Sequence, residues 1–84
     1  MRDTLRSPRQ QQLRALLRDL RKRHRLTQTQ VARRLAKTQS FVAKYEGGER
    51  RLSVIEFIDV VRALGAEPAV VIRQLIDVID CPNR

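Results

Sequence analysis

With 84 residues, 42% of them apolar and only 4% aromatic, the chain suits one domain with a small aliphatic core. Its single cysteine, Cys81, excludes an internal disulfide and leaves no second thiolate for a metal site. No apolar run approaches the roughly 18–20 residues that cross a bilayer, and the N-terminus lacks the apolar segment of a signal peptide, so we expect a cytoplasmic protein with no membrane attachment.

Helix signals follow one another along the chain, and no segment predicts a strand. After a polar segment, residues 1–7, that we expect to fray, Ser7 followed by Pro8 predicts the start of a first helix. This helix has a basic face opposite a stripe of buried leucines, namely Leu13, Leu16, Leu17 and Leu20. A capping box at Thr27 and Gln30 begins a second helix, whose inner face consists of Val31, Ala32 and Leu35.

A third helix begins at Thr38 or Gln39 and ends at the glycine pair 47–48. We expect its inward side chains to be Val42 and Tyr45, and its outward ones to be Gln39, Ser40, Ala43 and Lys44. Ser53 and Glu56 form the capping box of a fourth helix, which ends at Gly65 and which we expect to be lined by Ile55, Ile58, Val61 and Leu64. A fifth helix runs from Pro68 to about Ile79, and residues 80–84 form a polar tail.

The fifth helix carries more apolar residues than one buried stripe requires. Val71, Leu75 and Val78 form one line, and Ile72, Ile76 and Ile79 form the next. Either the helix lies in a groove that covers both lines, or the isoleucine line pairs with a second subunit. We favour the second subunit, because an uncovered stripe would be prone to aggregation.

Charge is distributed unevenly. Residues 1–52 hold 15 Lys and Arg against 4 Asp and Glu, a net charge of +11, whereas residues 53–84 hold 3 against 5, a net charge of −2. A basic front half predicts a polyanion-binding face. Charge alone does not distinguish nucleic acid from an anionic membrane or from a solvated basic surface.

The segment from Leu26 to Ser53 resembles the phage-repressor-like (XRE, Cro/repressor-type) helix-turn-helix family. The resemblance covers about residues 13–79 and rests on these positions: Leu26-Thr27-Gln28, Val31-Ala32, Leu35, Thr38-Gln39-Ser40, Val42, Tyr45-Glu46, Gly48 and Leu64-Gly65. It implies a single domain over residues 1–84 with an all-α, compact five-helix, lambda-repressor-like fold. Its third helix would enter the major groove of duplex DNA.

The resemblance also implies residue roles. The base-contacting residues would be Gln39, which can read an adenine, with Ser40 and Lys44. Gln28 would touch a phosphate and brace Gln39. Contacts to the DNA backbone would also come from Phe41, Arg50 and Arg51, and Arg21 would form a scaffold salt bridge with Glu46.

Some positions depart from the family pattern or have a plain interpretation. Phe41 either contacts a thymine methyl group or tucks between helices. Ala36 stands where a glycine is usual, so the turn is either strained by about 1 kcal/mol or shifted. Lys37 replaces an apolar residue of that turn. We expect His24 to be exposed and Cys81 to be incidental.

The sequence therefore predicts a transcriptional regulator, more readily a repressor than an activator, that binds an inverted-repeat operator as a homodimer through Ile72, Ile76 and Ile79. One alternative is a DNA-binding antitoxin that also holds a toxin, and another is a basic module that binds RNA or an acidic protein. No cofactor, metal or enzymatic activity is expected, because there is one His, one Cys and no glycine-rich phosphate loop.

Overall fold

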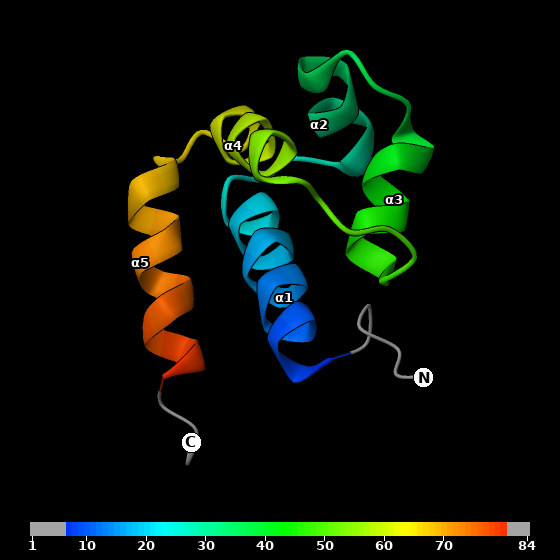
Figure 1. Ribbon diagram of the computed structural model, residues 1–84. Coiled ribbons are helices and arrows are strands. Elements are labelled where there is room, and N and C mark those ends of the chain that lie inside the picture. The colour runs from blue at the N-terminus through cyan, green and yellow to red at the C-terminus, as the bar shows by residue number, and fades with distance from the viewer. Residues whose placement is uncertain (1–6, 81–84) are drawn as a thin grey trace.

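The computed structural model describes residues 7–80, and it contains five α-helices and no strand within that range. They are α1 (Pro8–Arg23), α2 (Gln28–Leu35), α3 (Gln39–Gly47), α4 (Val54–Ala63) and α5 (Pro68–Ile79). In Figure 1, α5 lies on one side of α1 and the α2–α3 pair lies on the other. The expected all-α, five-helix fold is confirmed. Residues 1–6 and 81–84 lie outside the described range, and with them most of the segment expected to fray, Cys81 and most of the expected tail.

Local capping explains where the helices begin. The hydroxyl of Ser7 accepts a hydrogen bond from the Gln10 backbone at 3.2 Å, with Pro8 at the first helical position. The capping boxes predicted at Thr27 for α2 and at Ser53 for α4 are complete. Of the two possible starts of α3, the structure shows that Thr38 is the cap, because its hydroxyl accepts from the Phe41 backbone at 3.2 Å.

Eleven buried side chains form one core that all five helices share. The fully buried members include Tyr45, Leu17 and Leu64, and α5 contributes Val71. The whole set is Leu17, Leu20, Val31, Ala32, Val42, Tyr45, Phe57, Val60, Val61, Leu64 and Val71. Because these residues come from every helix, the core fixes α3 against α1 and α2 and leaves its outer face free.

The predicted inner face of α4 is wrong at its first residue. Ile55 is 67% exposed, whereas Phe57 and Val60 are buried beside Val61 and Leu64. The predicted set repeats every three residues, which falls short of the about 3.6 residues of a helical turn, so it drifts to the opposite face over the length of α4. The start of α4 therefore presents apolar surface instead of filling the core.

In the turn between α2 and α3, an alanine adopts the left-handed backbone conformation that usually favours glycine. Ala36 has φ 57° and ψ 39°, and the backbone N–H of Lys37 donates to the Ala32 carbonyl at 2.9 Å. Of the two outcomes expected for this turn, the structure shows strain and no shift. Alanine in this conformation costs about 1 kcal/mol relative to glycine.

None of the helices described between residues 7 and 80 is long and apolar enough to cross a membrane.

Candidate DNA-binding surface

The outer face of α3 presents three polar side chains to solvent. Gln39, Ser40 and Lys44 are all exposed, while Val42 and Tyr45 on the opposite side are buried. Thr38 caps the helix, so Gln39 is its first residue and projects from its N-terminal turn. A helix seated by a buried face and carrying exposed polar groups at its start is suited to reading base edges in a major groove.

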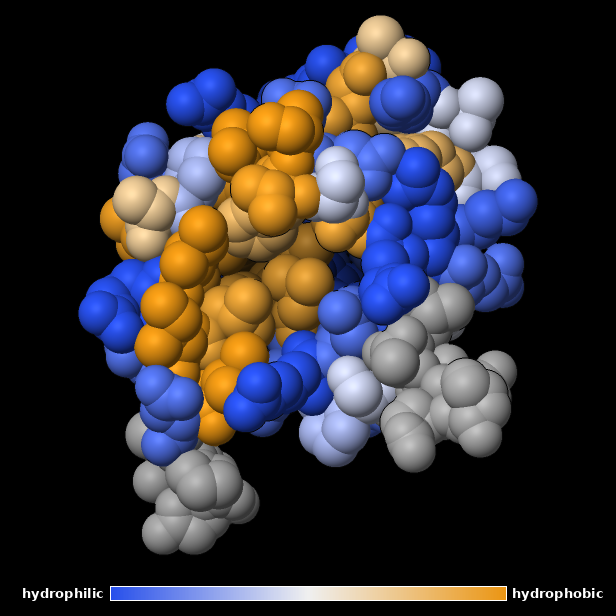
Figure 2. All heavy atoms as spheres, viewed as in Figure 1, coloured by the Kyte–Doolittle hydropathy of each residue, from blue (hydrophilic) through white to orange (hydrophobic). Residues whose placement is uncertain are grey.

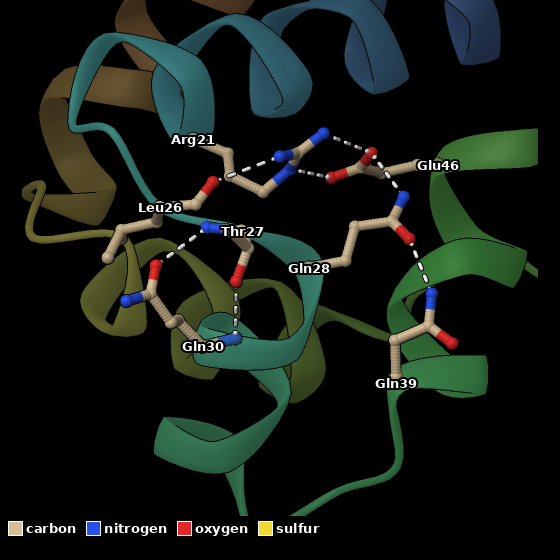
Figure 3. Close-up of polar contacts among 7 residues, drawn as sticks. All are labelled: Arg21, Leu26, Thr27, Gln28, Gln30, Gln39 and Glu46. Atoms are coloured by element: carbon tan, nitrogen blue, oxygen red, sulfur yellow. Dashed lines mark hydrogen bonds and ion pairs between the residues drawn. The ribbon is translucent and has the colours of Figure 1, made fainter.

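A continuous chain of hydrogen bonds connects the interior to Gln39 (Figure 3). Arg21 donates through Nε and Nη2 to the two oxygens of Glu46, at 2.7 and 3.0 Å. Gln28 Nε2 donates to Glu46 Oε1 at 3.0 Å, and Gln39 Nε2 donates to Gln28 Oε1 at 2.7 Å. The structure thus contains the expected Arg21–Glu46 salt bridge and the contact by which Gln28 braces Gln39.

The inner end of this chain is the better anchored. Only 12% of the Arg21 side chain and 5% of the Glu46 side chain are exposed. Hydrogen bonding to Glu46 raises the pKa of Arg21 above its ordinary value despite the opposing effect of burial. Arg21 Nη1 also donates to the Leu26 carbonyl at 2.9 Å, so one guanidinium joins α1, the segment before α2, and α3.

Phe41 packs partly against the core. Its ring makes an edge-to-face contact with Tyr45, with 5.7 Å between ring centroids. The Arg50 guanidinium lies 4.7 Å from the centroid of the Phe41 ring, and Lys37 Nζ lies 5.5 Å from it. The ring is therefore tucked between elements of the fold and stabilised by two cations. Contact with a thymine methyl group stays a prediction for its remaining surface.

The two arginines after α3 differ in their environment. Arg50 forms two hydrogen bonds with the Glu56 carboxylate, at 2.9 and 2.8 Å, and a third with the Arg51 carbonyl. Arg51 is exposed. Hydrogen bonds from Arg50, and then from the Ser53 backbone, lower the pKa of Glu56 to about 2. Arg50 would have to exchange or share this partner to reach a phosphate.

Two of these contacts are not predicted by the sequence. The first is the hydrogen bond between Gln28 and Glu46, and the second is the pairing of Arg50 with Glu56, which the sequence marks only as a cap. Both contacts join residues on different elements, and no periodic pattern marks such pairs. The carboxylate of Glu46 was a usable signal, because it is the only acidic residue of α3.

A second surface, formed by α4 and α5, is apolar. Ile72 and Ile76 are 41% and 38% exposed, Ile79 is half-buried, and Val54 is 72% exposed. Figure 2 shows apolar side chains gathered over α4, α5 and the hollow between α5 and α1. A groove of about 290 Å³ lies there, lined by Leu13, Leu52, Val54, Phe57, Ile72 and Leu75.

Between residues 7 and 80 there is no group of three or more His, Cys, Asp or Glu side chains that could hold a metal ion.

A family model and a solved structure both relate the chain to helix-turn-helix proteins. The model of a helix-turn-helix domain matches residues 12–75. A solved XRE-family-like protein from Pseudomonas syringae pv. tomato str. DC3000 is 43% identical, covers 83% of this chain and 85% of its own, and superposes with a TM-score of 0.81. No curated protein matches the chain.

Two more distant solved structures share the fold alone. The clp gene regulator ClgR from Corynebacterium glutamicum is 23% identical, with a TM-score of 0.75 over 88% of this chain and 79% of that one. A point mutant of the restriction–modification controller protein C.Esp1396I is 18% identical, with a TM-score of 0.80 over 90% and 96%. The family and the fold are those of DNA-binding regulators. The chain belongs to the XRE family of helix-turn-helix proteins.

Proposed function

We propose that the protein is a transcriptional repressor that binds an inverted-repeat operator as a homodimer, with α3 of each subunit in the major groove. The observation that carries the proposal is the exposed amide of Gln39, which is held by Gln28 and, through it, by the buried Glu46 carboxylate. A side chain fixed before binding loses less conformational freedom on contact with a base.

Base recognition would depend on three outward residues of α3. The Gln39 amide can form two hydrogen bonds with an adenine, and the Lys44 ammonium can donate to guanine O6 or N7. Ser40 lies beside Gln39 and is equally exposed, so its hydroxyl can add a contact of either polarity.

Backbone contacts would surround this face. Gln28 retains one amide hydrogen for a phosphate after its bond to Glu46. Arg51 is exposed, and Arg50 stands next to it above the Phe41 ring. Together with the net charge of +11 over residues 1–52, these groups supply the sequence-independent part of the affinity.

Dimerisation would use the apolar surface of α4 and α5. Ile72, Ile76 and Ile79 form the line expected to face a second subunit, and the exposed Val54 and Ile55 extend the surface. Leaving these side chains in water would create an aggregation-prone patch, and a second copy offers the same apolar chemistry. Two α3 helices would then lie roughly 34 Å apart, one turn of DNA.

Repression follows from the size of such a complex. A dimer seated on an operator can exclude other proteins from the same DNA without any additional surface. An antitoxin would bind DNA in the same way and use the exposed apolar face of α5 for a toxin. Its signature would be a stable complex of the dimer with a second, different chain.

The test is the Gln39→Ala variant on a site selected from random duplex DNA. The proposal predicts a loss of about 1–3 kcal/mol that falls on one base position in each half-site. Gln74→Ala is the matched control, because Gln74 is exposed on the side of α5 that also carries Arg73 and Asp77. An unchanged affinity and base preference for Gln39→Ala would instead favour a module that binds RNA or an acidic protein through charge.

A further inference from the structure

We infer that Glu46, although directed away from the DNA-facing side of α3, selects the base that Gln39 reads, because it fixes the orientation of two glutamine amides in series. The inference rests on the proposed function. It concerns which base is preferred at the position that Gln39 contacts. Glu46 would determine this preference without contacting DNA.

Glu46 can only accept hydrogen bonds, and its two oxygens already accept from Arg21. A neighbour that shares Oε1 must therefore offer a donor. Gln28 does so with Nε2 at 3.0 Å. The reverse orientation would place the Gln28 carbonyl oxygen against Glu46 Oε1 with no donor between the two acceptors, which is costly beside a buried carboxylate.

Gln28 transmits this donor–acceptor orientation to the surface. With Nε2 turned inward, Gln28 presents Oε1 to Gln39. Only the amide nitrogen of Gln39 can satisfy that oxygen, and it lies 2.7 Å away. The orientation of the exposed amide is thus set by a carboxylate two residues removed in the network.

The hydrogen bond to Gln28 determines which groups of the Gln39 amide remain for DNA. One N–H is used by Gln28, so Oε1 and the other N–H remain. Adenine presents N7 as an acceptor and N6 as a donor in the major groove, which matches this pair. Guanine presents two acceptors, N7 and O6, and would oppose Oε1 to one of them. The network therefore favours adenine over guanine.

The test replaces the carboxylate by an amide of the same shape, in E46Q. Either placement of the introduced amide sets its NH₂ group against one N–H of Arg21, so the polarity of Gln28 is no longer fixed. With the amide oxygen on Arg21 Nη2, Gln28 can keep its wild-type orientation; with the oxygen on Arg21 Nε, the NH₂ group faces Gln28 and requires an acceptor there. In the second placement Gln28 and then Gln39 reverse, so Gln39 directs only N–H donors at the base. We expect the ratio of affinities for operators with adenine and with guanine at this position to fall by about tenfold or more. Preference for guanine would be the full reversal.

The measured ratio is internal to each protein, so a lower folded fraction of E46Q acts on both operators alike. E56Q is the matched control, because Glu56 is also bound by an arginine but lies on α4 outside the network. Its ratio should equal that of the wild type. Gln28→Leu is a second variant that leaves the Arg21–Glu46 bridge in place. It frees the Gln39 amide to take either orientation and should bring the ratio close to one.

The outcomes separate the two proposals. If Gln39→Ala abolishes the adenine preference while E46Q and Gln28→Leu keep it, the inference is overturned and the proposed function stands. If the wild type shows no adenine preference at the position that Gln39 contacts, the orientation argument is also overturned. If the folded protein selects no DNA sequence at all, the proposed function fails, and the inference fails with it.

Discussion

The hydroxyl of Tyr45 is buried in the core and has no hydrogen-bond partner among residues 7–80. Burial raises the pKa of Tyr45 well above its ordinary value of 10.0, and the neighbouring Glu46 carboxylate acts in the same direction. A buried polar group without a partner costs stability, and removing it costs none of the ring packing. We therefore expect Tyr45→Phe to be neutral or to raise the free energy of unfolding by about 1 kcal/mol in urea at neutral pH.

The dependence of stability on alkaline pH gives a second test of Tyr45. The folded pKa lies above that of the unfolded chain, so the unfolded state loses its proton first. The free energy of unfolding is therefore unaffected by Tyr45 ionisation below pH 10.0 and falls as the pH rises above that value. Tyr45→Phe should remove this part of the fall. A loss of more than about 1 kcal/mol at neutral pH would show that the hydroxyl has a partner in solution.

At the scale of elements, the Arg50–Glu56 pair joins the segment after α3 to the first turn of α4. Glu56 accepts from Arg50 and from the Ser53 backbone, and its pKa is lowered to about 2. A depressed carboxyl pKa contributes stability above the unfolded value of 4.5, and this contribution is lost as the pH falls toward 2. Because both side chains are partly exposed, we expect E56Q to cost no more than about 1 kcal/mol at neutral pH.

Chemical denaturation at several pH values checks this. The difference in unfolding free energy between wild type and E56Q should shrink as the pH falls from 4.5 to 2. A difference that stays constant over that range would mean that the ion pair contributes nothing and that the variant acts through packing or through the cap alone.

Elements whose limits depend on local chemistry were predictable from sequence. Ser7 with Pro8, Thr27 with Gln30, and Ser53 with Glu56 each lie within one turn, and each marks a helix start that the structure contains. The strained turn at Ala36 was only half predictable, since whether a chain strains or shifts depends on the packing around it.

Contacts between elements were less accessible. The positions of Gln39, Ser40 and Lys44 on an exposed face follow from helical spacing, and the structure shows that exposure. The hydrogen bond between Gln28 and Glu46 depends on how α2 packs on α3, which periodicity does not specify. Ile55 was assigned to the core by a three-residue spacing that drifts around the helix, and the structure shows it to be 67% exposed.

At the scale of the whole molecule, we propose separate roles for the exposed apolar face and for the basic half of the chain. If a second copy covers the face, Ile72→Glu and Ile76→Glu should each convert the dimer to a folded monomer, because burying a carboxylate there is strongly unfavourable. Sedimentation velocity reports the mass, and circular dichroism reports that the helices persist. Gln74→Glu is the control that should stay dimeric, because Gln74 lies two residues from Ile72 and from Ile76 and therefore on the opposite side of α5.

A monomeric variant should also bind an inverted repeat much more weakly than the dimer does, because its two half-site contacts are no longer linked. The loss of affinity should exceed the loss caused by a change in one half-site. If the isoleucine variants remain dimeric and keep their affinity, the subunits associate elsewhere, and the apolar face has another occupant such as a toxin.

The central claim is sequence-specific recognition of duplex DNA by a dimer, and selection from a random duplex pool at near-physiological salt tests it most directly. We expect an enriched inverted repeat with half-sites about one helical turn apart and an adenine in each half at the position that Gln39 contacts. A folded protein that enriches no sequence, while binding DNA only through charge, would contradict the central claim.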